Sequence, residues 1–144
     1  MRLLFTTLLL ELVIGACSQG PPTQQPVALD GDSIRIPQTT VADGDVHFFT
    51  FEHDGKNVNF LVRSDGDGEI HTHLDACYAC YRYKRGFVVE GPNLVCIACR
   101  LEYAISDEVW DSIGACAPIS IHSSLDEDHL EIDQTIIERA ARYF

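Results

Sequence analysis

The sequence predicts a mainly β fold, a small α+β domain made of short strands and hairpins. Short apolar stretches alternate with turn residues along most of the chain after residue 28. Asp54-Gly55 stands between two of these stretches, and this pair is typical of a type I′ hairpin turn because both central residues there need positive φ. With 144 residues, the chain is long enough for one domain with its own core.

The expected elements follow the apolar stretches in order. Strands are predicted over 33–37, 46–52, 58–63, 69–74, 86–89 and 94–97. Short helices are predicted near 107–113 and 134–142, because Ser106 and Asp133 can each accept a hydrogen bond from the free N–H groups that begin a helix. The hairpins would present two Cys-x-x-Cys loops.

An internal repeat flanks the cysteine-containing middle of the chain. Residues 30–48 align without gaps on residues 126–144. The positions with an identical residue 96 places later are Asp30, Asp32, Ile36, Gln38, Thr39 and Phe48. One strand–turn unit used twice would explain this, and chance similarity of two short amphipathic stretches is the alternative. Two copies are too few for a solenoid.

The first residues predict export. Residues 3–14 form an almost wholly apolar run after Met1-Arg2. The run is too short for a helix to span a hydrocarbon core of about 30 Å, but it has the length found in signal peptides. Residues 1–16 are therefore predicted to be a signal peptide. Glu11 interrupts the run, so an ordinary secretory cleavage or an uncleaved anchor is the alternative.

The residues that follow predict a lipid anchor. The stretch 14–17 (Ile-Gly-Ala-Cys) resembles the lipobox of bacterial lipoproteins, which implies that Cys17 becomes the lipidated N-terminus. Residues 17–28 would comprise this cysteine and a Pro/Gln-rich tether, and residues 29–144 a single metal-binding domain. The expected location is the cell envelope, with the protein held to the membrane and facing the periplasm or the extracellular side.

Charge and motifs exclude several functions. The formal net charge is −12, which repels nucleic acid, so no nucleic-acid partner is expected. The chain has no Gly-x-Ser-x-Gly, His-Glu-x-x-His or phosphate-loop pattern, so an enzyme is not indicated, although a redox carrier fits.

Four cysteines carry the chemistry. Lipidation of Cys17 would leave five of the six cysteines, an odd number that cannot all form disulfides within one chain. Cys77-x-x-Cys80 and Cys96-x-x-Cys99 match the spacing of metal sites with four thiolates. Such a set suits zinc, an iron–sulfur cluster or cuprous copper. A thiol–disulfide pair is the alternative, but a redox Cys-x-x-Cys usually opens a helix in a βαβ unit.

Other side chains near these cysteines are weaker candidates. Cys116 is a fifth thiol that could be an additional ligand, a resolving thiol or a buried inert cysteine. His71 and His73 share one face of a predicted strand and could be additional ligands or support the cysteines, although an exposed pair is also common. The acidic stretch 65–69 is interpreted as a solvated turn. The aromatic residues expected to shield the site from water are Tyr78, Tyr81, Tyr83 and Phe87.

Several linked motifs resemble the FtrD-like family of membrane iron–sulfur proteins, here in a lipoprotein form. They are Asp75-Ala76-Cys77-x-x-Cys80, Gly86-Phe87, Glu90-Gly91, Cys96-x-x-Cys99, Gly114-x-Cys116-x-Pro118 and the final Ala141-Arg142-Tyr143-Phe144. The resemblance covers about residues 29–144. It implies an iron–sulfur or other metal centre on the four cysteines, with Cys116 close by, and a role in ferrous-iron uptake through electron transfer or metal handling.

The resulting hypothesis is an exported lipoprotein with a thiolate-bound metal centre, iron–sulfur or zinc, linked to iron or copper uptake. A membrane metal-transport or redox protein would be its partner. A structural zinc module that serves protein–protein interaction is the second hypothesis, and a thiol–disulfide redox protein is the third.

Overall fold

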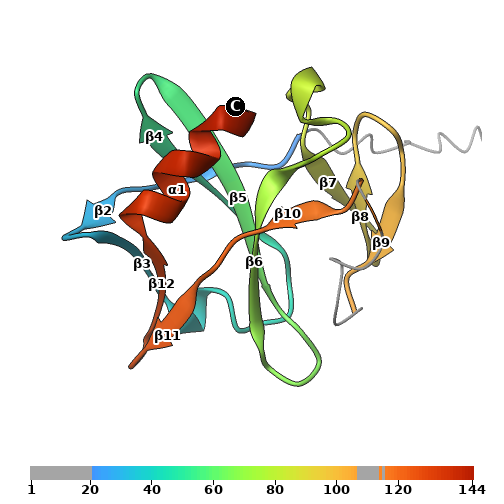
Figure 1. The fold of residues 1–144 in the computed structure, drawn as a ribbon. Coiled ribbons are helices and arrows are strands. Elements are labelled where there is room, and N and C mark those ends of the chain that lie inside the picture. The colour runs from blue at the N-terminus through green and yellow to red at the C-terminus, as the bar shows by residue number, and fades with distance from the viewer. Residues whose placement is uncertain (1–20, 107–113, 115) are drawn as a thin grey trace, which may run out of the picture.

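The computed structural model describes residues 21–106, 114 and 116–144. Its strands form three sheets (Figure 1). Sheet A has the order β1-β4-β5-β6-β10, with bounds Gln25–Val27, His47–His53, Lys56–Ser64, Ile70–Cys77 and Pro118–Ser120. Sheet B has the order β11-β12-β3-β2, with bounds Ser124–Asp126, His129–Asp133, Ser33–Pro37 and Leu29–Asp30. Sheet C has the order β7-β8-β9, with bounds Phe87–Glu90, Asn93–Cys96 and Glu102–Ala104.

The predicted mainly β fold is confirmed, and the hairpin at Asp54-Gly55 has the predicted geometry. Both turn residues have positive φ, 50° and 71°, and β4 and β5 pair antiparallel from His53–Lys56 to His47–Val62. β5 then pairs with β6 through a turn over 65–69. Because β5 lies in the middle of sheet A, its side chains are buried on both faces.

The internal repeat is a structural repeat. β3 and β12 occupy equivalent positions in the two copies and pair antiparallel with each other, centred on Arg35–Glu131. β2 and β11 flank them in equivalent ways. The next hydrogen bonds are also equivalent: Gln38 N donates to the Asp128 carbonyl at 2.7 Å, and Gln134 N donates to the Asp32 carbonyl at 2.8 Å. Sheet B is thus two copies of one hairpin related by an approximate twofold axis.

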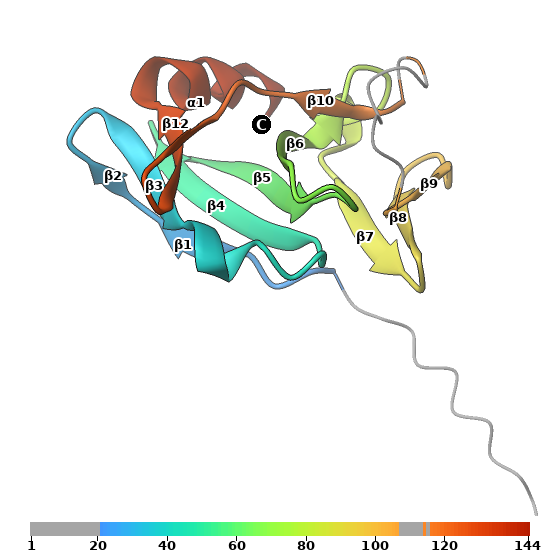
Figure 2. The same ribbon diagram turned by 90° about the horizontal axis from the view of Figure 1, so that it is seen from below.

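Two hydrophobic cores lie on opposite faces of sheet A. The larger core joins sheet A to sheet B and to the single α-helix of the described residues. The smaller core joins sheet A to sheet C and contains Phe48, Leu61, Cys77, Phe87, Leu94, Cys96, Tyr103 and Ala117. Figure 2 shows the helix on one side of the molecule and sheet C set apart at one end. The cysteines therefore belong to the smaller core.

The C-terminal helix is where the sequence predicted it. α1 covers Gln134–Ala140 and continues as a 3₁₀ turn, η4, over Ala141–Tyr143. Asp133 is its N-cap, with a carboxylate oxygen 2.7 Å from the Thr135 N–H. Ile137 and Ala140 face the larger core. The helix predicted near 107–113 lies outside the described residues.

The domain begins earlier than expected. Gln25–Val27 (β1) pairs in parallel with β4, within the stretch 17–28 that was predicted to be tether. The Gln24 side chain also donates to Asp75. No helix among the described residues is both long enough and apolar enough to cross a bilayer.

Replacing the helix cap tests the C-terminal assignment. Asp133→Ala removes the acceptor for the Thr135 N–H, so we expect the free energy of unfolding to fall by about 1 kcal/mol. Urea unfolding followed by circular dichroism measures this loss. Asp128→Ala is the charge-matched control, because Asp128 is an exposed aspartate in the turn that precedes β12. It should change the free energy of unfolding by less than about 0.5 kcal/mol. Equal losses in the two variants would contradict the capping role.

Candidate metal centre

The first cysteine pair lies at the end of β6. Side chains alternate along this strand, so Asp75 and Cys77 point to the face covered by sheet C. Cys77 is the last residue of β6, and Cys80 stands directly before the 3₁₀ turn η2 (Tyr81–Tyr83). The Cys80 N–H donates to the Cys77 sulfur at 3.2 Å, so the backbone of the loop contacts the first thiol directly.

The second pair lies at the end of β8. Cys96 is the last residue of this strand, and β7 places Phe87 directly opposite it. Two backbone hydrogen bonds close the loop: Arg100 N donates to the Cys96 carbonyl at 2.8 Å, and Cys96 N donates to the Leu101 carbonyl at 2.9 Å. Arg100 has φ of +63° in this tight turn. The loop therefore holds Cys99 close to Cys96.

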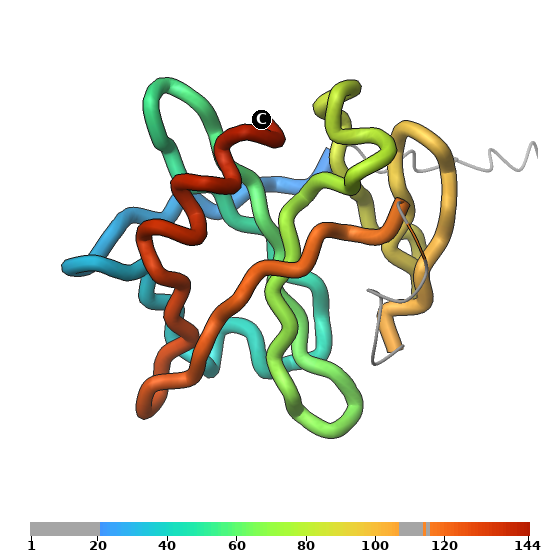
Figure 3. Tube along the Cα trace, viewed as in Figure 1, coloured from blue at the N-terminus to red at the C-terminus, as the bar shows by residue number. Residues whose placement is uncertain are grey.

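β10 brings Cys116 to the same place. Pro118 in β10 pairs with Cys77 at the end of β6, so the chain two residues before Pro118 lies beside the first cysteine pair. Figure 3 shows the chain from β10 to β11, in orange, running from beside sheet C across to sheet B. The Gly114-x-Cys116-x-Pro118 motif is thus the part of the sequence that puts a fifth thiol in the site.

The five sulfurs form two overlapping groups of three. Cys77, Cys80 and Cys96 have sulfurs within 4.8 Å of one another, and so do Cys80, Cys99 and Cys116. Cys80 belongs to both groups. None of these five cysteines is in a disulfide. The structure thus brings the four predicted ligands together and adds Cys116.

Crowding makes the thiols resist losing their protons together. Burial, followed by the neighbouring Cys77 and Cys99 thiols, raises the pKa of Cys80 far above its ordinary value. Burial also raises the pKa of Cys96 and that of Cys116. A cation that replaced these protons would relieve the repulsion between the resulting thiolates, which is how metal binding and thiol ionisation are linked.

Cys99 differs from the other thiols. Desolvation opposes its ionisation, but the Leu101 N–H and the neighbouring thiols of the cluster outweigh it and lower the pKa of Cys99. Cys99 is also the exposed member of the set. It is therefore the thiol that a metal ion arriving from solvent would meet first in its reactive form.

The Asp75 carboxylate fixes sheet C against sheet A. Its Oδ1 accepts the Phe87 N–H at 2.6 Å, and its Oδ2 accepts the Gln24 side chain at 3.2 Å. Gly86 lies so close that a Cβ there would be 2.6 Å from the carboxylate carbon. Gly86 in turn accepts the Ile97 N–H at 3.0 Å, within the second cysteine loop. These contacts connect the strand of the first pair to the loop of the second.

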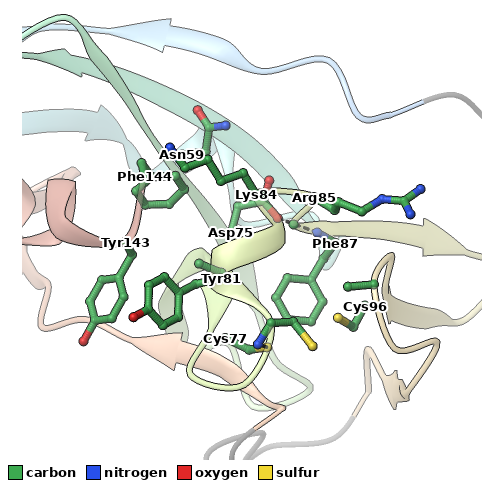
Figure 4. Close-up of a pocket in the computed structure, with 14 residues that line it drawn as sticks. Asn59, Asp75, Cys77, Tyr81, Lys84, Arg85, Phe87, Cys96, Tyr143 and Phe144 are labelled. Carbon is green, nitrogen blue, oxygen red and sulfur yellow. Dashed lines mark hydrogen bonds between the residues drawn. The ribbon is translucent and has the colours of Figure 1, made fainter.

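A small cavity of about 70 Å³ lies between this carboxylate and the sulfurs. Figure 4 shows Asp75 joined to Phe87 on one side, with Cys77 and Cys96 farther down beside the Phe87 ring. Lys84 and Arg85 also line the cavity, at its Asp75 end and away from the sulfurs. Burial raises the pKa of Asp75 to about 6, while the Phe87 N–H and Gln24 oppose the shift.

The aromatic side chains divide into two sets. Phe87 is 1% exposed and meets Tyr103 edge to face, so these two rings cover the buried side of the sulfurs. Tyr81 packs edge to face against Tyr143 from the C-terminal motif. The prediction that Tyr78 and Tyr83 shield the site is wrong, because they are 59% and 69% exposed.

The two histidines do not join the sulfurs. His71 lies with Asp65 and Glu69, its Nε2 2.7 Å from Asp65 Oδ2. His73 is 3% exposed on the same strand, and its ring centroid is 6.5 Å from that of His71. The predicted turn over 65–69 is confirmed, with Asp65 Oδ1 accepting two backbone N–H groups of that turn.

The donor set fits a thiolate-bound metal. Three or four sulfurs around one ion, each bonded at about 2.3 Å, stand about 4 Å apart, which is compatible with the separations of at most 4.8 Å in both groups. A cluster of several irons spreads its thiolates over different metal atoms, so the sulfurs would have to separate further to hold one. Neither Cys-x-x-Cys opens a helix of the kind found at thiol–disulfide sites.

Comparison with known protein families decides the family. A family model described as membrane iron–sulfur containing protein, FtrD-like, matches residues 41–144. This chain belongs to the FtrD-like family. The match covers both cysteine pairs, Cys116 and the C-terminal helix. Comparison with curated proteins and with solved structures finds no match. The description of the FtrD-like family associates it with a membrane and with iron and sulfur.

Sequence reasoning missed three residues of this FtrD-like site. Asp75 and Gly86 stood in the quoted motifs but had no role, and their contact shows why an acidic residue and a glycine occur there. Tyr103 lies outside every motif named above. A lone tyrosine in a three-residue strand gives no sequence signal, so only the fold reveals that it lies beside the cysteines.

The Gly86 contact predicts a specific loss of stability. Gly86→Ala would force a Cβ into the Asp75 carboxylate, so we expect it to cost at least about 2 kcal/mol more in unfolding free energy than its control. Gly91→Ala is the matched control. Gly91 has a similar φ, +58° against +64° at Gly86, but a Cβ added at Gly91 would meet no other atom. Both variants therefore bear the cost of positive φ. Equal losses in urea unfolding would contradict a clash at Gly86.

The buried carboxylate predicts a pH dependence. The folded pKa of Asp75 is about 6 against an ordinary 3.8, so the folded protein binds this proton more tightly than the unfolded chain. As pH rises from 4 to 6, the free energy of unfolding of the parent protein should therefore fall, by up to about 3 kcal/mol, relative to that of the Asp75→Asn variant. Above this range the difference should level off. Urea unfolding of the reduced, metal-free proteins at several pH values measures this difference. A constant difference between pH 4 and 7 would contradict it.

Proposed function

We propose that this FtrD-like protein is an exported lipoprotein that holds a metal centre on its cysteines and transfers electrons or handles metal outside the cytoplasm, linked to iron or copper uptake. The observation that carries the proposal is the meeting of five free thiols from three separate segments at one point. Thiolates packed this closely repel one another, and a cation that takes the place of the thiol protons removes that repulsion.

The surroundings of the thiols suit a tuned centre. A thiolate-bound iron or copper centre, when present, exchanges single electrons. The Cys80 N–H donates to the Cys77 sulfur, as hydrogen bonds to ligand atoms do in tuned metal centres, and Phe87 with Tyr103 keeps water from the buried side. Cys99 is exposed, so it gives a partner protein or an incoming ion direct access to the thiols.

The predicted lipid anchor determines where electron transfer or metal handling would take place. Lipid on Cys17 would hold the domain at the membrane surface, facing the periplasm or the extracellular side, beside a membrane metal-transport or redox protein. The family description, which names a membrane, supports this location. The acidic chain, with its net charge of −12, suits a partner that carries metal cations or basic patches.

Structural zinc is the second candidate, and the sulfur spacing favours it. Groups of three sulfurs within 4.8 Å are closer to the requirement of single ions than to that of a cluster. A zinc ion would staple β6, the β8 loop and β10 together without redox chemistry, and the module would then serve protein–protein interaction.

Metal analysis with a visible spectrum separates the candidates. The full-length chain, purified in detergent without oxygen, should contain iron or copper with a visible band that changes on reduction. Cys80→Ser removes the thiol that belongs to both groups of sulfurs and should lower metal content at least tenfold. Cys17→Ser is the control, and it should keep its metal but leave the membrane fraction.

Each alternative has its own result. Tightly held zinc without a visible band would overturn the redox role and support the structural module. Metal-free protein whose free thiols increase after reduction would overturn both and favour thiol–disulfide chemistry. Cys17→Ser protein that stays in the membrane fraction would contradict the lipid anchor.

A further inference from the structure

We propose that the cysteine centre has two metal positions that share the Cys80 sulfur as a bridge. The inner position consists of Cys77, Cys80 and Cys96, and the outer position of Cys80, Cys99 and Cys116. This inference rests on the proposed metal-binding function and assigns Cys116 a ligand role in a site of its own. Each position would take a thiophilic closed-shell ion such as zinc or cuprous copper.

The two positions differ in access to solvent. Cys77 and Cys96 are 1% and 2% exposed, and their sulfurs lie within the smaller core. Cys99 is exposed, and Cys80 and Cys116 are half-buried. An ion at the outer position would therefore face solvent, whereas an ion at the inner position would be enclosed. The shared sulfur would let an ion pass inward without losing all its thiolate ligands.

The spacing favours two groups of three over one group of four. Among the described residues, the sulfurs that lie within 4.8 Å of one another fall into these two triads, and this limit is compatible with the separation of about 4 Å needed by three sulfurs around one ion. A thiolate has more than one lone pair, so Cys80 can serve both ions. The charge balance also favours two ions. Two divalent ions bound to five thiolates would leave a net charge of −1, whereas one divalent ion would leave −3.

Tyr103 provides an independent observation at the outer position. Tyr103 is 1% exposed, and its hydroxyl has no hydrogen-bond partner among the described residues. A buried hydroxyl without a partner is costly. Burial raises the pKa of this hydroxyl, and negative charge on Cys116, followed by that on Cys99, would raise it further. A metal-bound thiolate of Cys116 would give the hydroxyl the charged acceptor that it lacks.

Cadmium titration tests the number of positions. The reduced full-length chain carrying Cys17→Ser, which leaves only the five domain cysteines, is titrated with Cd²⁺ without oxygen, and bound ions are counted by equilibrium dialysis. We expect two ions per chain, and one after Cys116→Ser is added. Tyr103→Phe should keep both ions but weaken the second about tenfold, the loss expected for one hydrogen bond to a charged group. Cadmium NMR should show two signals coupled through the shared sulfur.

His71→Gln is the matched control, because Asp65, Glu69 and His71 form the other group of described residues that could take an ion. It should leave the count at two. A count that falls to one with His71→Gln but not with Cys116→Ser would overturn the outer position. One ion in both the parent chain and Cys116→Ser would overturn it while leaving the proposed function intact. No bound ion in the parent chain would overturn both. Two uncoupled cadmium signals would overturn the bridge.

Discussion

The contact between the Asp75 carboxylate and the Gly86–Phe87 backbone is the interaction on which the site depends. It joins the strand that ends in the first cysteine pair to the hairpin that ends in the second. The carboxylate is buried at a cost, as its raised pKa shows, and the Phe87 N–H and Gln24 offset part of this cost. Gly86 is required because any side chain there would occupy the space of the carboxylate. Together with the apolar packing of the smaller core, this contact sets the relation between the two Cys-x-x-Cys loops.

Sheet A divides the molecule into a scaffold and a chemical half. On one face, the twofold-related hairpins of sheet B and helix α1 enclose a core whose described members include no cysteine. On the other face, the small sheet C has only three short strands, and its core includes Cys77 and Cys96. The duplicated half is regular and has the larger core, whereas the other half combines a smaller apolar core with a few polar contacts and the thiols. This division explains why the repeated segments flank the cysteines in the sequence.

The sequence predicted those parts of the structure that have local signals. Asp54-Gly55 identified its hairpin, Asp133 identified the start of α1, and the cysteine spacing identified four thiols that come together. The repeat predicted equivalent strands but not that they would pair with each other. Strands such as β1 and β10 have three residues each and form only because neighbouring strands supply their partners, so no periodic pattern marks them. Cys116 and Tyr103 join the site through β10 and β9, and their place was therefore not predictable from spacing.

The cysteine-free core has a consequence for the order of events in the life of the protein. Small domains whose interior is organised by a metal cannot fold until that metal arrives. Here the larger core can form from apolar side chains alone, since sheet B, most of sheet A and α1 bury Ile34, Phe60, Ile132 and their neighbours without any thiol. Maturation can thus proceed in two stages, with a chain that is already compact waiting for its metal. Such a chain can resist proteolysis before any metal binds, because its larger core is already closed.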